Sequence, residues 1–288
     1  MNHRDALEIL GQNARVYDAR RQTATSLRQL TMEEAYERLP LAYPDVEPHK
    51  LWEYFDSLFP DATSSEHAAL CRALAPRLPA PSVFESENTT LPGGHGRIGL
   101  VRNRYNENAY DTFSHMVTHA KPSYYSDFSA ACEDVADGRC EFCILPVEST
   151  RDGRLFGFYA MLDRYELRIC AACRSDIDEL AEPVRFALVG KHPPDRLPKN
   201  ALWILECSLA SEADEFPAEL PLDARIFDAS TVRIDSLSVP YDDGRGRHFF
   251  TFRLPQGTAS AFHFYLSSQY PRYAPIGLYP LVNESNER

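Results

Sequence analysis

The sequence lacks any run of about 18 apolar residues, the length at which a segment becomes a candidate membrane-spanning helix. Residues 1–10 carry Arg4, Asp5 and Glu8 and lack the apolar stretch of a secretory signal. Basic residues are also in deficit, because 30 Lys and Arg stand against 42 Asp and Glu, a net charge of -12. A nucleic-acid surface needs a basic patch. We therefore expect a protein that binds neither membranes nor nucleic acids.

Motifs for several common chemistries are missing as well. There is no Gly-x-Ser-x-Gly elbow of a serine hydrolase and no nucleotide-binding loop. Gly93, Gly94 and Gly96 are not followed by a Lys-Ser/Thr pair, so the proline- and glycine-rich stretch 79–96 is interpreted as a linker. No cofactor is expected.

Seven cysteines, an odd and scattered set, favour reduced thiols and a cytoplasmic location. Cys140-x-x-Cys143 and Cys170-x-x-Cys173 could together supply four thiolates to a structural zinc ion. Small apolar cysteines are also common in protein cores, and we favour that interpretation. His115 and His119 lie four apart on an expected helix, but no acid stands between them, which favours a surface pair. No metal ligand is assigned.

The chain divides into three regions by pattern. Residues 1–80 have apolar residues at helical spacing, and residues 97–198 alternate between strands and helices, which predicts an α/β layer of mostly parallel strands. Residues 199–288 give the order β-α-β-β-α-β, a ferredoxin-like arrangement. The predicted fold class is α/β (α+β overall): a helical N-terminal region, one α/β lobe and a ferredoxin-like C-terminal domain.

Three segments carry a family resemblance. The first is the stretch from Cys143 to Leu155, in which an apolar strand runs into Pro146-Val-Glu-Ser-Thr150 and then Gly153. The second is Val184-Arg185-Phe186, followed by a strand. The third comprises Ile234-Asp-Ser236 and Gly277-Leu-Tyr-Pro280. In this order the segments resemble the prephenate dehydratase family, whose C-terminal part is a regulatory ACT domain.

The resemblance implies a periplasmic-binding-protein-like α/β lobe, here truncated, and an activity of phenylalanine biosynthesis, the lyase conversion of prephenate to phenylpyruvate. It implies a homodimer and a small aromatic acid, prephenate-like or phenylalanine, as ligand. Hydroxyls and an arginine fork are suited to hold carboxylates, so the candidate substrate-binding residues are Ser149, Thr150 and Arg185. The candidate regulatory residues of the ACT-like region are Glu219, Leu220, Asp235 and Ser236.

Three departures from the family bear on catalysis. The threonine of the family's Thr-Arg-Phe motif, its key hydroxyl, is Val184 here, which has neither donor nor acceptor. The family's glycine-rich substrate loop would fall near residues 102–108, where this sequence has no glycine. Only residues 173–183 fill the gap in which the family inserts a second α/β lobe. An alternative cationic pocket of Arg102, Arg104 and Arg185 stays open.

No catalytic residue is therefore assigned, and whether the protein is an enzyme stays undecided. Three hypotheses follow: a prephenate dehydratase-like protein with altered or lost catalysis, a non-catalytic aromatic-acid-binding or ACT-type regulatory protein, and a zinc-stabilised interaction module.

Overall fold

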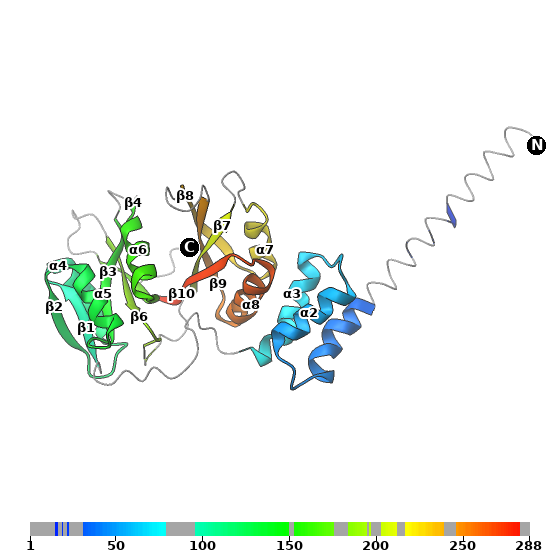
Figure 1. The fold of residues 1–288 in the computed structure, drawn as a ribbon, viewed down its shortest axis with the longest axis horizontal. Helices are drawn as coiled ribbons and strands as arrows, with labels where there is room; N and C mark the ends of the chain where they lie inside the picture. Colours follow the sequence, from blue (N-terminus) through cyan, green and yellow to red (C-terminus); the bar gives the residue numbers. More distant parts are fainter. Residues whose placement is uncertain are drawn as a thin grey trace, which may run out of the picture. The chain divides into compact units, whose positions relative to one another are not determined.

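The computed structural model describes residues 15, 16, 19, 22, 31–78, 96–149, 153–175, 184–194, 196, 203–211, 217–238 and 246–282. The chain divides into two compact units, Met1–Leu78 and Pro79–Arg288 (Figure 1). Most of the expected linker, residues 79–95, lies outside the described part. The expected further boundary at residue 198 stays a prediction. None of the described helices is long and apolar enough to cross a membrane.

The described part of the first unit is mainly helical, as its apolar spacing predicts. Residues 31–42 form a helix, followed by α2 (Pro48–Leu58), α3 (Ser64–Leu74) and the 3-10 turn η1 (Ala75–Arg77). Thr63 and Glu66 form a reciprocal capping box that begins α3. The core of the first unit contains Trp52, Phe55 and Leu70.

The second unit is built on one ten-stranded mixed sheet. The strands run in the spatial order β2-β1-β3-β6-β5-β10-β7-β9-β8, with β4 paired to β3. Their bounds are β1 (Arg97–Val101), β2 (Lys121–Tyr125), β3 (Phe142–Ser149), β4 (Gly153–Arg154), β5 (Arg168–Ser175), β6 (Val184–Gly190), β7 (Trp203–Ser211), β8 (Ser230–Ser238), β9 (Gly246–Leu254) and β10 (Tyr273–Val282). The α/β fold class is confirmed.

The expectation of mostly parallel strands is wrong. Among the described strands, only β1 with β2, β1 with β3, and β5 with β10 pair in parallel. Residues 176–183 are all that connects β5 to β6, whereas a parallel crossover needs a dozen or more residues. The chain therefore returns as an antiparallel strand, and β6 pairs antiparallel with both β5 and β3.

Strands β1 to β6 and three helices make up what we call the α/β half. The helices are α4 (Arg104–Ser114), α5 (Phe128–Ala136) and α6 (Phe156–Tyr165). The sequence pattern places the start of α4 at Ala109, but the Asn103 side chain caps the helix five residues earlier by accepting from the Asn106 backbone N–H at 2.9 Å. Residues 102–108, expected as a substrate loop, are thus mostly the first turns of α4.

The remaining elements form what we call the ferredoxin-like half. It contains β7 to β10 with α7 (Leu220–Ile226) and α8 (Ala259–Gln269), in the element order β-α-β-β-α-β that the sequence predicts. Its strands lie in the order β10-β7-β9-β8, and every neighbouring pair is antiparallel. Phe250 and Phe252 of β9 are buried, and Phe252 meets Phe262 of α8.

The two halves share a sheet and a core. Strand β10 pairs with β5, and a Cβ added to Gly277 would stand 2.7 Å from Ile169 Cβ, so only glycine permits this approach. On the face of the sheet that carries α5 and α6, one apolar cluster includes Leu162 of α6 and Phe249 of β9. Because apolar surface of each half is buried by the other, the seam between them is a fixed part of the fold.

Candidate functional site

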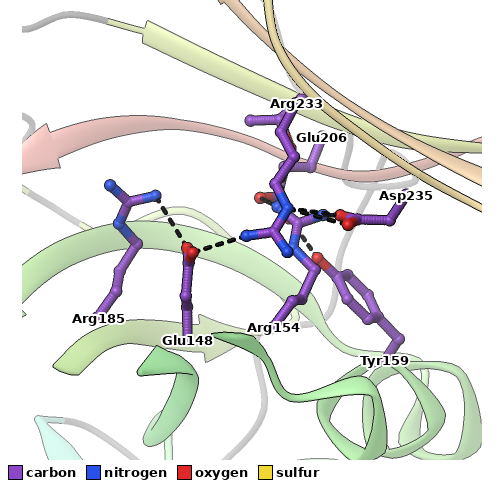
Figure 2. Close-up of polar contacts among 8 residues, drawn as sticks. Glu148, Arg154, Tyr159, Arg185, Glu206, Arg233 and Asp235 are labelled. Atoms are coloured by element: carbon purple, nitrogen blue, oxygen red, sulfur yellow. Dashed lines mark hydrogen bonds and ion pairs between the residues drawn. The ribbon is translucent and has the colours of Figure 1, made fainter. Parts of the chain in front are cut away.

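A line of alternating charges runs along the seam between the two halves. Figure 2 shows how their side chains point toward one another. We call this set the charge ladder; its members, in order, are Arg185, Glu148, Arg233, Asp235, Arg154, Glu206 and Tyr159. Three arginines balance three carboxylates, so the ladder carries no formal net charge.

The inner end of the ladder is buried. Arg154 Nη2 lies 3.1 Å from Glu206 Oε1 and donates to Thr251 Oγ1 at 2.9 Å, and the Tyr159 hydroxyl donates to Glu206 Oε2 at 3.3 Å. The side chains of Arg154 and Glu206 are only 2% and 3% exposed. Buried charges are tolerated when they are paired and hydrogen-bonded, as Arg154 Nη2 and the Glu206 carboxylate are.

The local electrostatics keep this end in one ionisation state. Burial acts to lower the pKa of Arg154, but the carboxylates of Glu206 and Asp235 raise it overall. Burial, together with the Glu206 carboxylate, raises the pKa of Tyr159 well above its ordinary value. Arg154 therefore stays cationic and Tyr159 stays a neutral hydrogen-bond donor.

The outer end of the ladder reaches solvent. Glu148, near the end of β3, lies between Arg233 Nη1 at 2.6 Å and Arg185 Nη1 at 3.6 Å. The side chains of Arg185, Glu148 and Arg233 are 34%, 29% and 32% exposed. The Arg185 contact is too long for a hydrogen bond, so a ligand can replace it at small cost.

The middle of the ladder connects the candidate substrate-binding site with the candidate regulatory site, which were predicted as two separate sites. Arg233 Nε lies 2.9 Å from Asp235 Oδ2, and Arg154 Nη1 lies 3.2 Å from the same oxygen. Arg185 is a candidate substrate-binding residue, and Asp235 is a candidate regulatory residue. The structure connects them through Glu148 and Arg233.

The other substrate-site candidates lie near the outer end. Ser149 stands opposite Val184 in the β3–β6 pairing, and Val184 has Ser175 of β5 as its opposite neighbour on the other side. Val184 thus lies between two serines of the neighbouring strands. Thr150 lies outside the described residues.

The remaining regulatory candidates are dispersed. Glu219 precedes α7 and is exposed, whereas Leu220, at the start of α7, is buried. Ser236 Oγ contacts His248 Nδ1 of β9 at 2.7 Å. No contact recorded among the described residues brings Glu219 or Leu220 to Asp235, so their grouping stays a prediction.

The alternative cationic pocket is not assembled by the contacts of the described residues. The Arg102 guanidinium lies over the Tyr124 ring, 5.4 Å from its centroid, whereas Arg185 reaches Glu148. The eight residues 176–183 between β5 and β6 are also too few to form a second lobe.

The cysteine pairs lie in different parts of the core. Cys140 and Cys143 belong to the apolar cluster that contains α5 and α6, and Cys170 and Cys173 belong to the cluster that contains α4 on the other face. No three metal-ligating side chains gather anywhere in the described part of the chain. A single zinc site made of these four thiolates is therefore contradicted. His115 follows the end of α4, and His119 has a left-handed backbone with φ of 57°, so they do not share a helix.

Four ladder residues were not predicted from the sequence: Arg154, Tyr159, Glu206 and Arg233. Glu206 carried a usable signal, because it is a lone acid in the apolar run Trp203-Ile-Leu-Glu-Cys. A charge on a buried strand needs an oppositely charged partner. The sequence cannot say that this partner is Arg154, which lies 52 residues earlier in the chain.

Known proteins that are similar to this chain indicate its fold but do not assign it to a family. The sequence matches no family profile and no curated protein. The prephenate dehydratase of Streptococcus mutans is similar in structure, with a TM-score of 0.51 and 17% identity over 64% of this chain and 98% of that one. The prephenate dehydratase of Arthrobacter aurescens, solved in complex with L-Phe, has a TM-score of 0.47 and 12% identity over 64% and 90%. A quorum-quenching acylase, GqqA, has a TM-score of 0.48 and 15% identity over 65% and 96%. The likeness to the Streptococcus mutans structure shows a divergent prephenate dehydratase-like fold over 64% of this chain.

Proposed function

We propose that this protein is a non-catalytic, prephenate dehydratase-like protein of aromatic amino-acid metabolism that binds an aromatic α-amino acid, with phenylalanine as the first candidate. One observation supports the ligand class above others. Glu148 lies at the solvent-reaching end of the ladder, between two partly exposed arginines, Arg185 and Arg233.

This arrangement matches the charges of an amino acid. A zwitterion presents one ammonium and one carboxylate. Glu148 suits the ammonium, and the planar guanidinium of Arg185 suits the carboxylate in a bidentate fork. The long contact between Arg185 and Glu148 is the one that the ligand replaces, while Arg233 keeps Glu148 in place at 2.6 Å.

The proposed loss of lyase activity has a separate basis. Departure of the prephenate hydroxyl requires a proton donor, and Val184 supplies none. Ser175, beside Val184, already donates to Asn108 Oδ1 at 2.8 Å. A cleft between two lobes would exclude water from the reaction, but the eight residues between β5 and β6 are too few to form a second lobe.

Titration calorimetry with four ligands tests the binding proposal. L-Phenylalanine is expected to bind saturably. Phenylpyruvate lacks the ammonium and phenethylamine lacks the carboxylate, so each is expected to bind at least about tenfold more weakly, the loss of about one charged contact. D-Phenylalanine tests stereochemistry. Absence of heat from L-phenylalanine up to millimolar concentration would overturn the proposal.

Two variants localise the site. Arg185→Ala is expected to remove phenylalanine binding. Arg247→Ala is its matched control, because Arg247 is also 34% exposed and also lies in an ion pair, with Asp163. Glu148→Gln provides a test of sign: it is expected to weaken phenylalanine binding and to strengthen phenylpyruvate binding, because a competing carboxylate is removed from the arginines.

A retained lyase is the second candidate, since Glu148 and Arg185 of the family motifs are present. Pure protein incubated with prephenate is expected to give no phenylpyruvate absorbance. Turnover by the wild type would favour the second candidate. If Val184→Thr creates activity, the missing hydroxyl was the sole defect; continued inactivity points to the missing lobe.

A further inference from the structure

Tyr279 of β10 lies close to the charge ladder without being a member of it. The residue is 3% exposed and belongs to the same apolar cluster as Tyr159. A Cβ added to Gly277 would stand 3.0 Å from Tyr279 Cδ1, so the tyrosine ring leans along β10 over that glycine. Gly277 is the register partner of Glu206 on β7. The ring of Tyr279 therefore extends toward the inner end of the ladder.

The charges that act on the Tyr279 hydroxyl come from both ends of the ladder. Burial raises the pKa of Tyr279 well above its ordinary value, the Glu206 carboxylate raises it further, and the Arg185 guanidinium acts to lower it. Glu206 belongs to the inner end of the ladder and Arg185 to the outer end. The hydroxyl is thus within electrostatic range of both ends, and it stays a neutral hydrogen-bond donor.

The two tyrosines of this cluster differ in what their hydroxyls bind. The Tyr159 hydroxyl donates to Glu206 Oε2 at 3.3 Å. The structure records no hydrogen bond between the Tyr279 hydroxyl and any of the residues that it describes. A polar group that is shielded from water and lacks a partner costs free energy, so it needs an explanation other than the stability of the fold. The Tyr279 hydroxyl is a donor available to a ligand.

We propose that Tyr279 is a further ligand-binding residue, whose hydroxyl donates a hydrogen bond to the carboxylate that Arg185 holds. This inference rests on the proposed function, because it concerns the same amino-acid ligand. A guanidinium fork and a hydroxyl together satisfy more of the acceptor positions of a carboxylate than the guanidinium alone. Tyr279 belongs to the ferredoxin-like half and Arg185 to the α/β half, so the bound carboxylate connects the two halves.

Calorimetry with Tyr279→Phe tests the contact, because this variant keeps the ring and removes only the hydroxyl. It is expected to weaken the binding of L-phenylalanine and phenylpyruvate by at least about tenfold, the loss of one hydrogen bond to a charged group. Phenethylamine has no carboxylate and is expected to bind the variant and the wild type equally. A merely structural role of Tyr279 would weaken all three ligands alike and would overturn the proposal.

Tyr273→Phe is the matched control on the same strand. The Tyr273 hydroxyl lies 2.7 Å from His263 Nδ1, so its hydrogen bond is made within the ferredoxin-like half. The control is expected to bind L-phenylalanine as the wild type does. Circular dichroism confirms that each variant is folded. Equal weakening by Tyr273→Phe and Tyr279→Phe would show that binding responds to the loss of any buried hydroxyl, and would overturn the proposal.

Thermal denaturation without ligand tests the assignment independently. Because its hydroxyl bonds none of the described residues, Tyr279→Phe is expected to have a Tm equal to that of the wild type or higher. Tyr159→Phe loses a hydrogen bond and is expected to lower the Tm by several degrees. A loss in Tyr279→Phe as large as that in Tyr159→Phe would show that the hydroxyl serves the fold, and would overturn the proposal even if phenylalanine binds.

The outcomes distinguish this inference from the proposed function. If L-phenylalanine binds the wild type and Tyr279→Phe equally, Tyr279 is not a binding residue and the proposed function stands. If the wild type binds none of the three ligands, the proposed function fails and the role of Tyr279 fails with it. Weaker binding of the two carboxylates in a variant of undiminished stability is the result that supports both.

Discussion

The two ends of the charge ladder are made of the same chemical groups in different surroundings. At the inner end Arg154 and Glu206 are 2% and 3% exposed and their contact is 3.1 Å; at the outer end Arg185 and Glu148 are 34% and 29% exposed and their contact is 3.6 Å. Water screens the outer ion pair and competes with it for hydrogen bonds. The inner ion pair is shielded from water and is stabilised by the protein groups around it.

This difference in burial gives the two ends of the ladder different roles: the inner end stabilises the fold, and the outer end is suited to binding. Removing one partner of a buried pair leaves a charge with no compensation, so the inner pair contributes to holding the two halves together. The outer pair can open without unfolding anything, which makes it suitable for exchange with a ligand. Arg233 and Asp235 connect the outer end of the ladder to the inner end.

The largest effect is expected from Arg154→Met. It leaves Glu206 buried beside Tyr159 and Thr251 without its cation, and we expect the free energy of unfolding to fall by about 3–5 kcal/mol. Urea denaturation measures this loss. The double variant Arg154→Met with Glu206→Leu is expected to be more stable than the single variant, and a further loss in the double variant would show that the pair is not the cause.

A smaller effect is expected from Tyr159→Phe. It removes the hydroxyl that donates to Glu206 and is expected to cost about 1.5–3 kcal/mol below pH 10. Because the pKa of Tyr159 is raised in the folded protein, its hydroxyl contributes stability that is fully present below the ordinary pKa near 10 and is lost as pH rises further. The gap between wild type and variant should therefore narrow above pH 10. A gap that widens there would contradict the assignment.

At the outer end, Arg185→Ala is expected to change the free energy of unfolding by only about 0–1 kcal/mol while abolishing phenylalanine binding. Thermal denaturation and calorimetry on the same preparation give both values. A stability loss comparable with that of Arg154→Met would show that the outer pair is structural after all.

The smallest effect is expected at a pair outside the ladder. Arg247 and Asp163 are 2.8 Å apart but 34% and 62% exposed. Arg247→Ala is expected to change the free energy of unfolding by about 0.5 kcal/mol or less and to leave ligand binding unchanged. A larger change would show that contact distance outweighs burial, which is the opposite of what the ladder indicates.

Elements with a strong period were predictable from the sequence. The apolar runs around Leu205 and Phe250 and the alternating pattern of residues 231–239 predict strands, and the apolar run before Glu148 predicts a buried strand. The order β-α-β-β-α-β follows. Strand β2 was missed because Lys121 and Pro122 are atypical of strands. The start of α4 was misplaced because Asn103, its cap, was not recognised as such.

The site was predictable only in part. Arg185 was identified from a motif, and Asp235 from another, since local sequence carries the resemblance in both segments. Their connection was not predictable, because Arg233 and Glu148 are 85 residues apart in the chain and meet only when β10 pairs with β5. The spacing of residues along the sequence does not indicate that the side chains of Arg233 and Glu148 come into contact.

The sequence by itself determined the periodic elements, the lack of a hydroxyl at Val184 and the shortness of the β5–β6 connection, since each is a property of neighbouring residues. The tertiary structure alone decided that β6 runs antiparallel, that the cysteine pairs lie on opposite faces, and that one charge ladder joins the halves. Charge interactions depend on distance and burial, and both are fixed by packing between segments remote in the chain.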